Sequence, residues 1–90
     1  MKFEWNETKS LRNKRKHGID FETATDLWND GNRVELHASH PLEDRGIMIG
    51  EIGKKLWTAI FTMRGETTRI ISVRRARKRE GELYGQKGTS

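Results

Sequence analysis

The sequence predicts an α+β domain in which an antiparallel sheet meander is preceded by two helices and followed by one. Residues 45–74 contain three segments in which apolar and polar side chains alternate, a pattern typical of strands with one buried face. The connections between them are too short for a parallel crossover, so neighbouring strands are expected to be antiparallel. On both sides of this region the composition and the capping residues are those of helices. The chain has 90 residues, and we expect a single domain over 1–90.

The N-terminal part predicts a short strand over 2–5 and a helix over 7–17. The strand places its two aromatic residues on one face. Asn6 is a suitable N-cap for the helix, and Gly18 is a suitable residue to end it. Because the helix has little apolar content, we expect it on the surface, where it presents five cations: Lys9, Arg12, Lys14, Arg15 and Lys16.

A second helix is predicted over 21–28, with Asp20 as its N-cap. Its apolar residues recur at helical spacing and form a buried stripe of Phe21, Ala24, Leu27 and Trp28. A turn at 29–32, a weak strand over 33–39 and a loop over 40–44 then lead into the meander.

The meander is expected to have strands over 45–52, 55–62 and 67–74, with turns at 53–54 and 63–66. A third helix is predicted over 74–84, with one stripe formed by Ala76, Glu80, Leu83 and Tyr84. Gly81 weakens this helix by roughly 1 kcal/mol relative to alanine. Residues 85–90 are expected to form a frayed tail. The predicted order of elements is β-α-α-β-β-β-β-α.

The composition favours a polyanionic partner and excludes several classes of protein. Eighteen Lys and Arg residues against thirteen Asp and Glu give a net charge of +5, which suits nucleic acid or an acidic protein. The chain has no cysteine, which excludes disulfides and thiolate chemistry. No run approaches the ~20 apolar residues of a membrane span, and no secretory signal is visible. We therefore expect a cytoplasmic protein that does not bind membranes.

Two cationic regions stand out, namely the first helix and the junction between the last strand and the last helix. In the last strand, Arg69 alternates with Ile71 and Val73, whereas Arg74 alternates with Ile70 and Ser72. We expect a sheet face on which cations lie beside apolar residues, a combination that can hold phosphates and stack bases. The alternative is a charged face that is simply solvated.

Cleavage of RNA without a metal requires a base for the 2′-OH, cations for the charged phosphorane and an acid for the 5′-oxygen. Arginines suit the phosphate because the guanidinium can bind it bidentately. The chain offers Arg64, Arg69 and Arg74 for this task, and His17, Glu80, Tyr84 and Lys9 for moving protons. The spacing of these residues does not show that they converge.

Each of these residues also has a purely structural interpretation. His17 could only cap a helix, and Glu80 could only pair with Arg77 or Lys16. Tyr84 could close the core, and Arg64 could be an ordinary exposed residue of a turn. The three tryptophans are expected in the core rather than as stacking platforms for bases.

Metal and nucleotide cofactors are not expected. The pair His37 and His40, followed by Glu43 and Asp44, has a spacing that suits a helix better than the extended segment predicted there. The sequence has no Walker motif, no glycine-rich phosphate loop before a helix and no G-x-S-x-G.

Two separated motifs resemble those of the BrnT toxin family. The stretch "FEWNETKSLRNKRKHGIDFETA" is similar to its N-terminal signature at Phe3, Glu4, Trp5, Lys9, Asn13, Lys16, His17, Gly18, Phe21 and Ala24. The stretch "RIISVRRARKREGELY" is similar to its second signature at Arg69, Ile70, Ile71, Ser72, Arg74, Ala76, Glu80 and Tyr84. Arg45, Gly50 and "FTMRG" with Arg64 fit between them, so the resemblance spans residues 3 to 84. Asn6 departs from it, because the family usually has Asp at that position.

The resemblance implies a RelE-like fold and a ribonuclease toxin of a type II toxin-antitoxin system, which inhibits translation and growth. It also implies a partner, a BrnA-like antitoxin with a ribbon-helix-helix DNA-binding domain. The complex would repress its own operon, so the toxin would meet operator DNA only through the antitoxin.

Residues and resemblance together predict a metal-independent endoribonuclease. Arg64 and Arg74 would stabilise the scissile phosphate, and His17 or Glu80 would move a proton. Tyr84 and Lys9 would position the RNA strand, with further substrate contacts from Lys16, Arg69 and Arg77. The alternative is a non-catalytic basic module that docks an antitoxin or nucleic acid.

Overall fold

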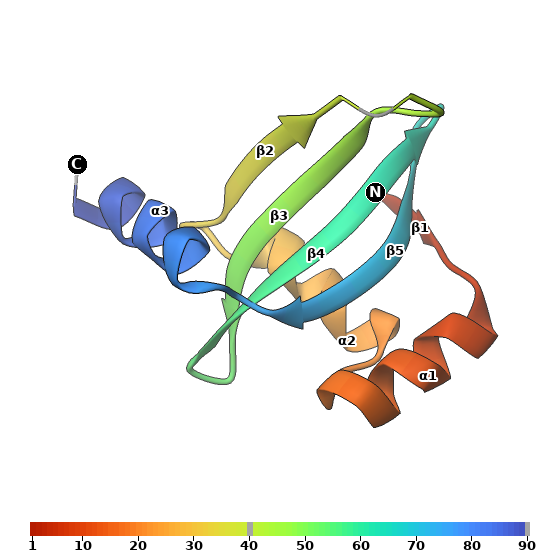
Figure 1. Ribbon diagram of the computed structural model, residues 1–90, viewed down its shortest axis with the longest axis horizontal. Coiled ribbons are helices and arrows are strands. Elements are labelled where there is room, and N and C mark those ends of the chain that lie inside the picture. The colour runs from red at the N-terminus through yellow and green to blue at the C-terminus, as the bar shows by residue number, and fades with distance from the viewer. Residues whose placement is uncertain (40, 90) are drawn as a thin grey trace.

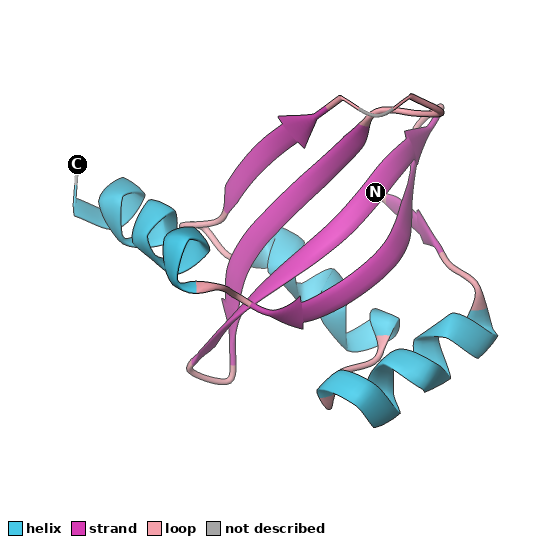
Figure 2. Cartoon of the chain, viewed as in Figure 1, coloured by secondary structure: helices cyan, strands magenta, loops and turns pink. Residues whose placement is uncertain are grey.

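A five-stranded sheet forms the centre of the structure, a computed structural model that describes residues 1–39 and 41–89, and only the backbone of 86–89. The elements are β1 (Lys2–Glu4), α1 (Glu7–His17), α2 (Phe21–Ala24), the 3₁₀ helix η1 (Thr25–Asn29), β2 (Val34–Ala38), β3 (Arg45–Ile52), β4 (Lys55–Arg64), β5 (Thr67–Arg75) and α3 (Lys78–Thr89). Figures 1 and 2 show α1, α2 and η1 beneath and behind the sheet, and α3 at one end of the sheet, away from these helices. The predicted α+β class and the meander are confirmed.

The strand order is β1-β5-β4-β3-β2. Strands β2 to β5 form the predicted antiparallel meander. The sheet as a whole is mixed, because β1, whose partner the sequence did not predict, lies parallel to β5, with Phe3 opposite Thr68. The two helices between β1 and the meander carry the chain to the far edge of the sheet, and this long connection permits the parallel pairing.

The predicted helix caps are present. The side chain of Asn6 accepts a hydrogen bond from the backbone N–H of Lys9, and Gly18 ends α1 in the left-handed region with φ of 83°. The second helix is not the continuous α-helix predicted over 21–28, because it changes to a 3₁₀ helix at Thr25. There the Thr25 hydroxyl donates to the carbonyl of Glu22, and such local bonds compete with regular helix hydrogen bonds. No helix in the described part of the chain is long and apolar enough to cross a membrane.

The core lies between the sheet and α1, α2 and η1. Its buried apolar side chains are Ile19, Phe21, Ala24, Leu27, Met48, Trp57, Ala59, Phe61, Ile70 and Val73. Trp57 belongs to this cluster, and Trp5 and Trp28 pack against it, so the tryptophans are core residues as predicted. The ring of Phe61 covers Gly46 so closely that a Cβ at this glycine would overlap it.

Strand β5 continues further than predicted, and the last helix begins later. Arg75 pairs with Trp57, and the N–H of Ala76 donates to the carbonyl of Leu56, so the ladder occupies residues that were assigned to a helix from 74. The helix then runs from Lys78 to Thr89. The frayed tail over 85–90 stays a prediction, because the side chains of 86–89 and the whole of Ser90 lie outside the described residues.

A β-bulge at Ile71 changes which face the arginines of β5 occupy. Ser72 lies opposite Ile60 and Ile70 lies opposite Phe61, so Ile71 has no partner across the ladder. Strict alternation would put Arg69 and Arg74 on opposite faces. With the bulge they lie opposite Thr62 and Thr58, which are on the same face of β4. The alternation assumed from the sequence is therefore wrong, and both arginines belong to the face away from α2.

Candidate functional site

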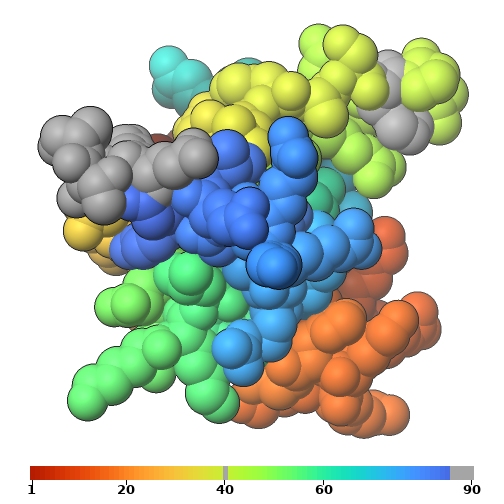
Figure 3. Space-filling view, turned by 60° about the vertical axis from the view of Figure 1, so that its left-hand side comes forward, coloured from red at the N-terminus to blue at the C-terminus, as the bar shows by residue number. Residues whose placement is uncertain are grey.

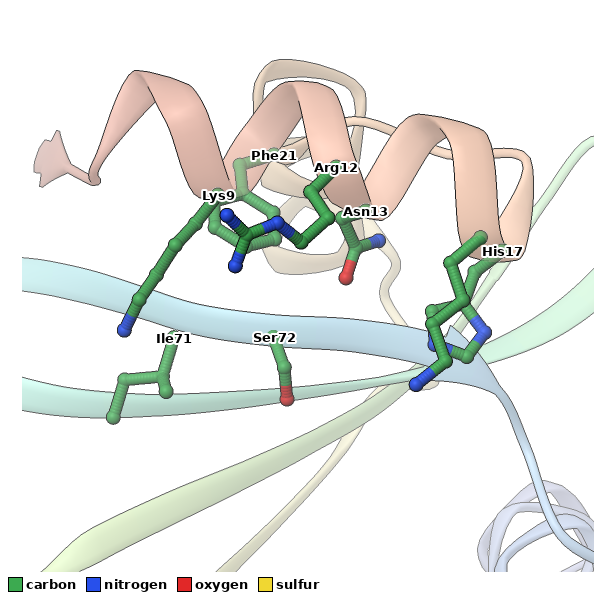
Figure 4. A pocket seen from close by; sticks show the side chains of 8 residues that line it. Lys9, Arg12, Asn13, His17, Phe21, Ile71 and Ser72 are labelled. Atoms are coloured by element: carbon green, nitrogen blue, oxygen red, sulfur yellow. The ribbon is translucent and has the colours of Figure 1, made fainter.

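A cavity of about 240 Å³ lies between α1 and the bulged part of β5. Its lining is strongly cationic and consists of Lys9, Arg12, Asn13, Lys16, His17, Phe21, Ile71 and Ser72. Figure 4 shows Lys9 and Arg12 extending from α1 over β5, with His17 at the end of the helix. Positions 9, 12 and 16 fall on one side of an α-helix, so α1 directs a row of cations towards β5.

Asn13 holds α1 against the sheet. Its side-chain amide donates to the carbonyls of Ile19, at 2.8 Å, and Val73, at 2.9 Å. Its carbonyl oxygen accepts from the N–H of Val73 at 3.3 Å. Strand β1 does not reach this part of the edge of β5, so one buried side chain satisfies both backbone groups that a neighbouring strand would otherwise pair.

Arg74 and Glu80 form a bidentate ion pair beside this cavity. The two guanidinium nitrogens donate to the two carboxylate oxygens at 2.7 and 2.8 Å. Glu80 also accepts hydrogen bonds from the Thr58 hydroxyl and from the backbone N–H of Arg77, at the beginning of α3. The carboxylate therefore fixes the planar group of Arg74 and caps the helix.

This environment decides what Glu80 can do chemically. The hydrogen bonds from Arg74 lower the pKa of Glu80 to about 2, even though partial burial opposes the charge. The same pair raises the pKa of Arg74. A carboxylate with such a low pKa is a weak proton acceptor at neutral pH, so the geometry suits Glu80 for positioning Arg74 rather than for moving a proton.

Replacing Glu80 by glutamine is expected to remove part of the acid sensitivity of the fold. The pKa of the folded state lies below the ordinary value of 4.5, so ionised Glu80 stabilises the protein above about pH 4.5. That contribution, on the order of 2 kcal/mol, is lost as the pH falls towards 2. Denaturant unfolding should show the E80Q variant less stable than the wild type at pH 7, with a clearly smaller difference at pH 3 that disappears only towards pH 2.

Glu82→Gln is the matched control, since Glu82 is an exposed carboxylate on the same helix. It should change the free energy of unfolding little at either pH. An E80Q deficit of the same size at pH 7 and pH 3 would contradict a stabilising role for the ionised carboxylate.

Five of the predicted residues are brought together. Lys9, Lys16 and His17 line the cavity, and Arg74, which pairs with Glu80, is two residues beyond the lining residue Ser72. Arg74 follows Ser72 by two residues on the same face of β5, a separation of about 7 Å along a strand. Figure 3 shows the end of α1, in orange, directly beside the end of β5, in blue.

The other four predicted residues lie apart from this group. Arg64 is the last residue of β4, six positions beyond Thr58, the partner of Arg74, which separates the two arginines by roughly 20 Å. Arg69 forms an ion pair with Glu4 at 3.1 Å. Arg77 is exposed just before α3.

Tyr84 lies one helical turn after Glu80 on α3. Its hydroxyl donates to the carboxylate of Asp30, at the end of η1, at 2.7 Å. Desolvation and the nearby Asp30 raise the pKa of Tyr84 to about 12, so the phenol stays protonated at neutral pH. The contact ties α3 to the turn after η1.

A second cavity, of about 380 Å³, lies at the other end of the sheet and is lined by His37, Glu43, Asp44, Arg45, Gly46, Phe61, Thr62 and Met63. His37 contacts Glu35 at 2.9 Å. The other histidine of the H-x-x-H pair, His40, lies outside the described residues. Among the residues that are described, no three His, Asp or Glu side chains are placed to hold a metal ion.

The sequence-based site omitted three polar residues that line the cavity. Arg12 was expected on the surface of α1 but not as a site residue, although its spacing from Lys9 and Lys16 is the signal that could have found it. Asn13 and Ser72 belong to the two sequence motifs, but no role in the site was predicted for them. Nothing in the strand pattern indicates the bulge that brings Ser72 to the cavity.

The comparison with protein families gives one match. Residues 5–80 match the family described as ribonuclease toxin, BrnT, of type II toxin-antitoxin system. The search of curated proteins gives no match. The matched range includes α1, the whole meander and Glu80, and so contains both sides of the cationic cavity.

Proposed function

The chain belongs to the BrnT family of ribonuclease toxins, and from this we propose that it is a metal-independent endoribonuclease whose active site is the cavity between α1 and β5 together with Arg74. One observation carries the proposal. Helix α1 presents cations and an imidazole to a cavity that β5 closes, and two residues beyond the lining residue Ser72 the same strand carries Arg74, whose guanidinium Glu80 fixes. Such an arrangement suits a phosphate that gains negative charge during a reaction.

In the proposed reaction, the imidazole of His17 takes the proton of the 2′-OH, and the resulting alkoxide attacks the adjacent phosphorus. Arg74 and the cations of α1 stabilise the phosphorane. The bond to the 5′-oxygen then breaks, and the ammonium of Lys16 supplies the proton that this oxygen needs. The products are a 2′,3′-cyclic phosphate and a 5′-hydroxyl, and no metal takes part. An imidazole suits the first step because it exchanges protons near neutral pH.

The remaining predicted residues receive roles according to their positions. Glu80 holds Arg74 in place. Because Arg64 is roughly 20 Å from Arg74, we propose that it contacts a different phosphate of the RNA. Lys9, Arg12, Arg69 and Arg77 would bind the strand on either side of the cleaved bond. Tyr84 would act through α3, whose position its bond to Asp30 helps to fix.

The test is incubation of the purified protein with total RNA in EDTA. We expect the wild type to produce RNA ends with a 2′,3′-cyclic phosphate, and His17→Ala to lower the initial rate by about 10²–10⁴-fold. Arg15→Ala is the control, because it removes a cation from α1 that does not line the cavity. The RNA ends are identified by their resistance or sensitivity to phosphatase before and after acid treatment.

Three outcomes would contradict the proposal or part of it. Cleavage that disappears in EDTA would show that a metal is required. Intact RNA with the wild type, both free and in the presence of ribosomes, would favour a basic module that only docks a partner. Equal rates for His17→Ala and Arg15→Ala would remove His17 from the mechanism.

Toxins of type II systems have an antitoxin partner, and we propose that the partner here is BrnA-like, with a ribbon-helix-helix domain. The complex would bind operator DNA through that domain and repress its own operon, and the free toxin would act on RNA in the cytoplasm. The resemblance of the two sequence motifs supports this proposal. A shift of operator DNA by the complex, but not by the toxin alone, is the expected result.

A further inference from the structure

An apolar row crosses the face of the sheet that is turned away from α2 and η1. Leu36, Ile47, Ile60 and Ser72 lie directly opposite one another on the four strands from β2 to β5. Side chains opposite one another in a ladder share a face. All four are partly exposed, and we call them the apolar row.

The row is unusual for its position. When one face of an antiparallel sheet meets water, that face normally carries polar side chains. The neighbouring row on this face, which contains Ile49 and Thr58, is covered by α3, because this helix packs against β2 and β3 at that end of the sheet. Figure 1 shows that no described helix lies in front of the middle of β3 and β4. The apolar row is therefore a surface without a partner in the described chain.

Arginines border the apolar row on both sides. Arg45 and Arg69 lie on the side towards the β4–β5 turn, and Arg74 lies on the side towards α3. The Nε of Arg45 is buried and has no hydrogen-bond partner among the described residues. Among the described residues no carboxylate pairs with Arg45, so its positive charge stays available to a partner. Glu4 and Glu80 already pair with Arg69 and Arg74, so carboxylates suit this face.

We propose that the apolar row is the docking surface for an acidic, amphipathic helix of the antitoxin, which covers Ser72 and Arg74 and so blocks the RNA site. The proposal rests on the proposed function only for this last step. The row spans three strand spacings, or about 14 Å. Apolar residues over two turns of a helix cover about 11 Å, which suits this length. Carboxylates at the ends of such a helix would reach the arginines on either side.

Two other occupants fit the row less well. RNA bases stack on aromatic rings or guanidinium planes, whereas the row consists of branched aliphatic side chains and a serine. A second copy of this chain would bring the arginines of one copy against those of the other, with a net charge of +5 on each. An acidic apolar segment has neither problem.

The test measures binding of the cognate antitoxin by titration calorimetry without RNA. We expect the double substitution Ile47→Thr/Ile60→Thr to weaken antitoxin binding at least tenfold and to leave the rate of RNA cleavage unchanged. Leu11→Thr is the control, because Leu11 is exposed on α1, away from the row. Arg45→Glu should also weaken binding. If the double variant unfolds, Leu36→Thr on the edge strand β2 replaces it.

The outcomes separate the docking proposal from the nuclease proposal. Because the binding assay contains no RNA, it tests the docking surface even if the wild type has no nuclease activity. Wild-type affinity in both the double variant and Arg45→Glu would overturn the docking proposal. A double variant that loses RNA cleavage but binds the antitoxin normally would also overturn it. Self-association of the wild type that the double substitution abolishes would do the same.

Discussion

Replacing Arg74 by alanine is expected to lower the rate of RNA cleavage by about 10²–10³-fold, the usual effect of losing one fixed donor to a developing charge. Glu80 holds this guanidinium through two hydrogen bonds, so it is oriented before RNA binds. Arg74→Lys should lose nearly as much, because an ammonium cannot bridge both carboxylate oxygens and keep the same plane. Single-turnover cleavage at saturating protein measures this effect apart from binding.

Arg75→Ala is the matched control for Arg74. It removes the same charge from the next residue, but Arg75 lies over the ring of Trp57, on the other face of β5. We expect its cleavage rate to stay within about threefold of the wild type. Equal losses in the two variants would mean that cleavage responds to net charge and not to the position of the guanidinium. Thermal unfolding of both variants shows whether the fold is retained.

Asn13→Ala is expected to have the largest effect on stability. It removes three hydrogen bonds and leaves the N–H and carbonyl of Val73 and the carbonyl of Ile19 without their partner in a buried place. The expected loss is roughly 3 kcal/mol. In a domain of this size, such a loss lowers Tm by more than ~10 °C. Calorimetry or denaturant unfolding measures it.

Asn13→Asp tests whether hydrogen bonding or shape is responsible. Aspartate has nearly the same shape, but its carboxylate cannot donate to the two carbonyls and would face them with a negative charge. It should be at least as destabilising as alanine. Arg12→Ala, which replaces an exposed residue of the same helix, should change the stability by no more than about 0.5 kcal/mol. An Asn13→Asp protein as stable as the wild type would contradict the role given to the amide.

The elements that were predicted well are those with local signals. Asn6 and Gly18 determine where α1 begins and ends, and the alternation of β3 and β4 is visible without a partner. The errors arose where a distant contact decides the structure. Three residues of β1 pair with β5, more than sixty positions away, and Arg75 joins a strand because Trp57 lies opposite.

The candidate site was predicted in part for the same reason. Residue types and motifs indicated His17, Lys9 and Arg74, but neither shows that the cations of α1 lie beside β5. The bulge at Ile71 and the hydrogen bonds of Asn13 determine that arrangement. Tyr84 was chosen by type and motif, and only the structure shows that its hydroxyl meets Asp30.

The amide of Asn13 also protects the protein from aggregation. Unpaired backbone groups along the edge of a sheet can recruit a strand from another molecule. On the β5 side, β1 occupies the first part of the edge, and at Val73 the asparagine occupies both groups that such a strand would use. The outermost strands of the sheet are then β1, which is three residues long, and β2, which is five residues long with exposed Glu35 and His37. Intermolecular sheet growth in the described part of the chain is therefore limited to short edge strands.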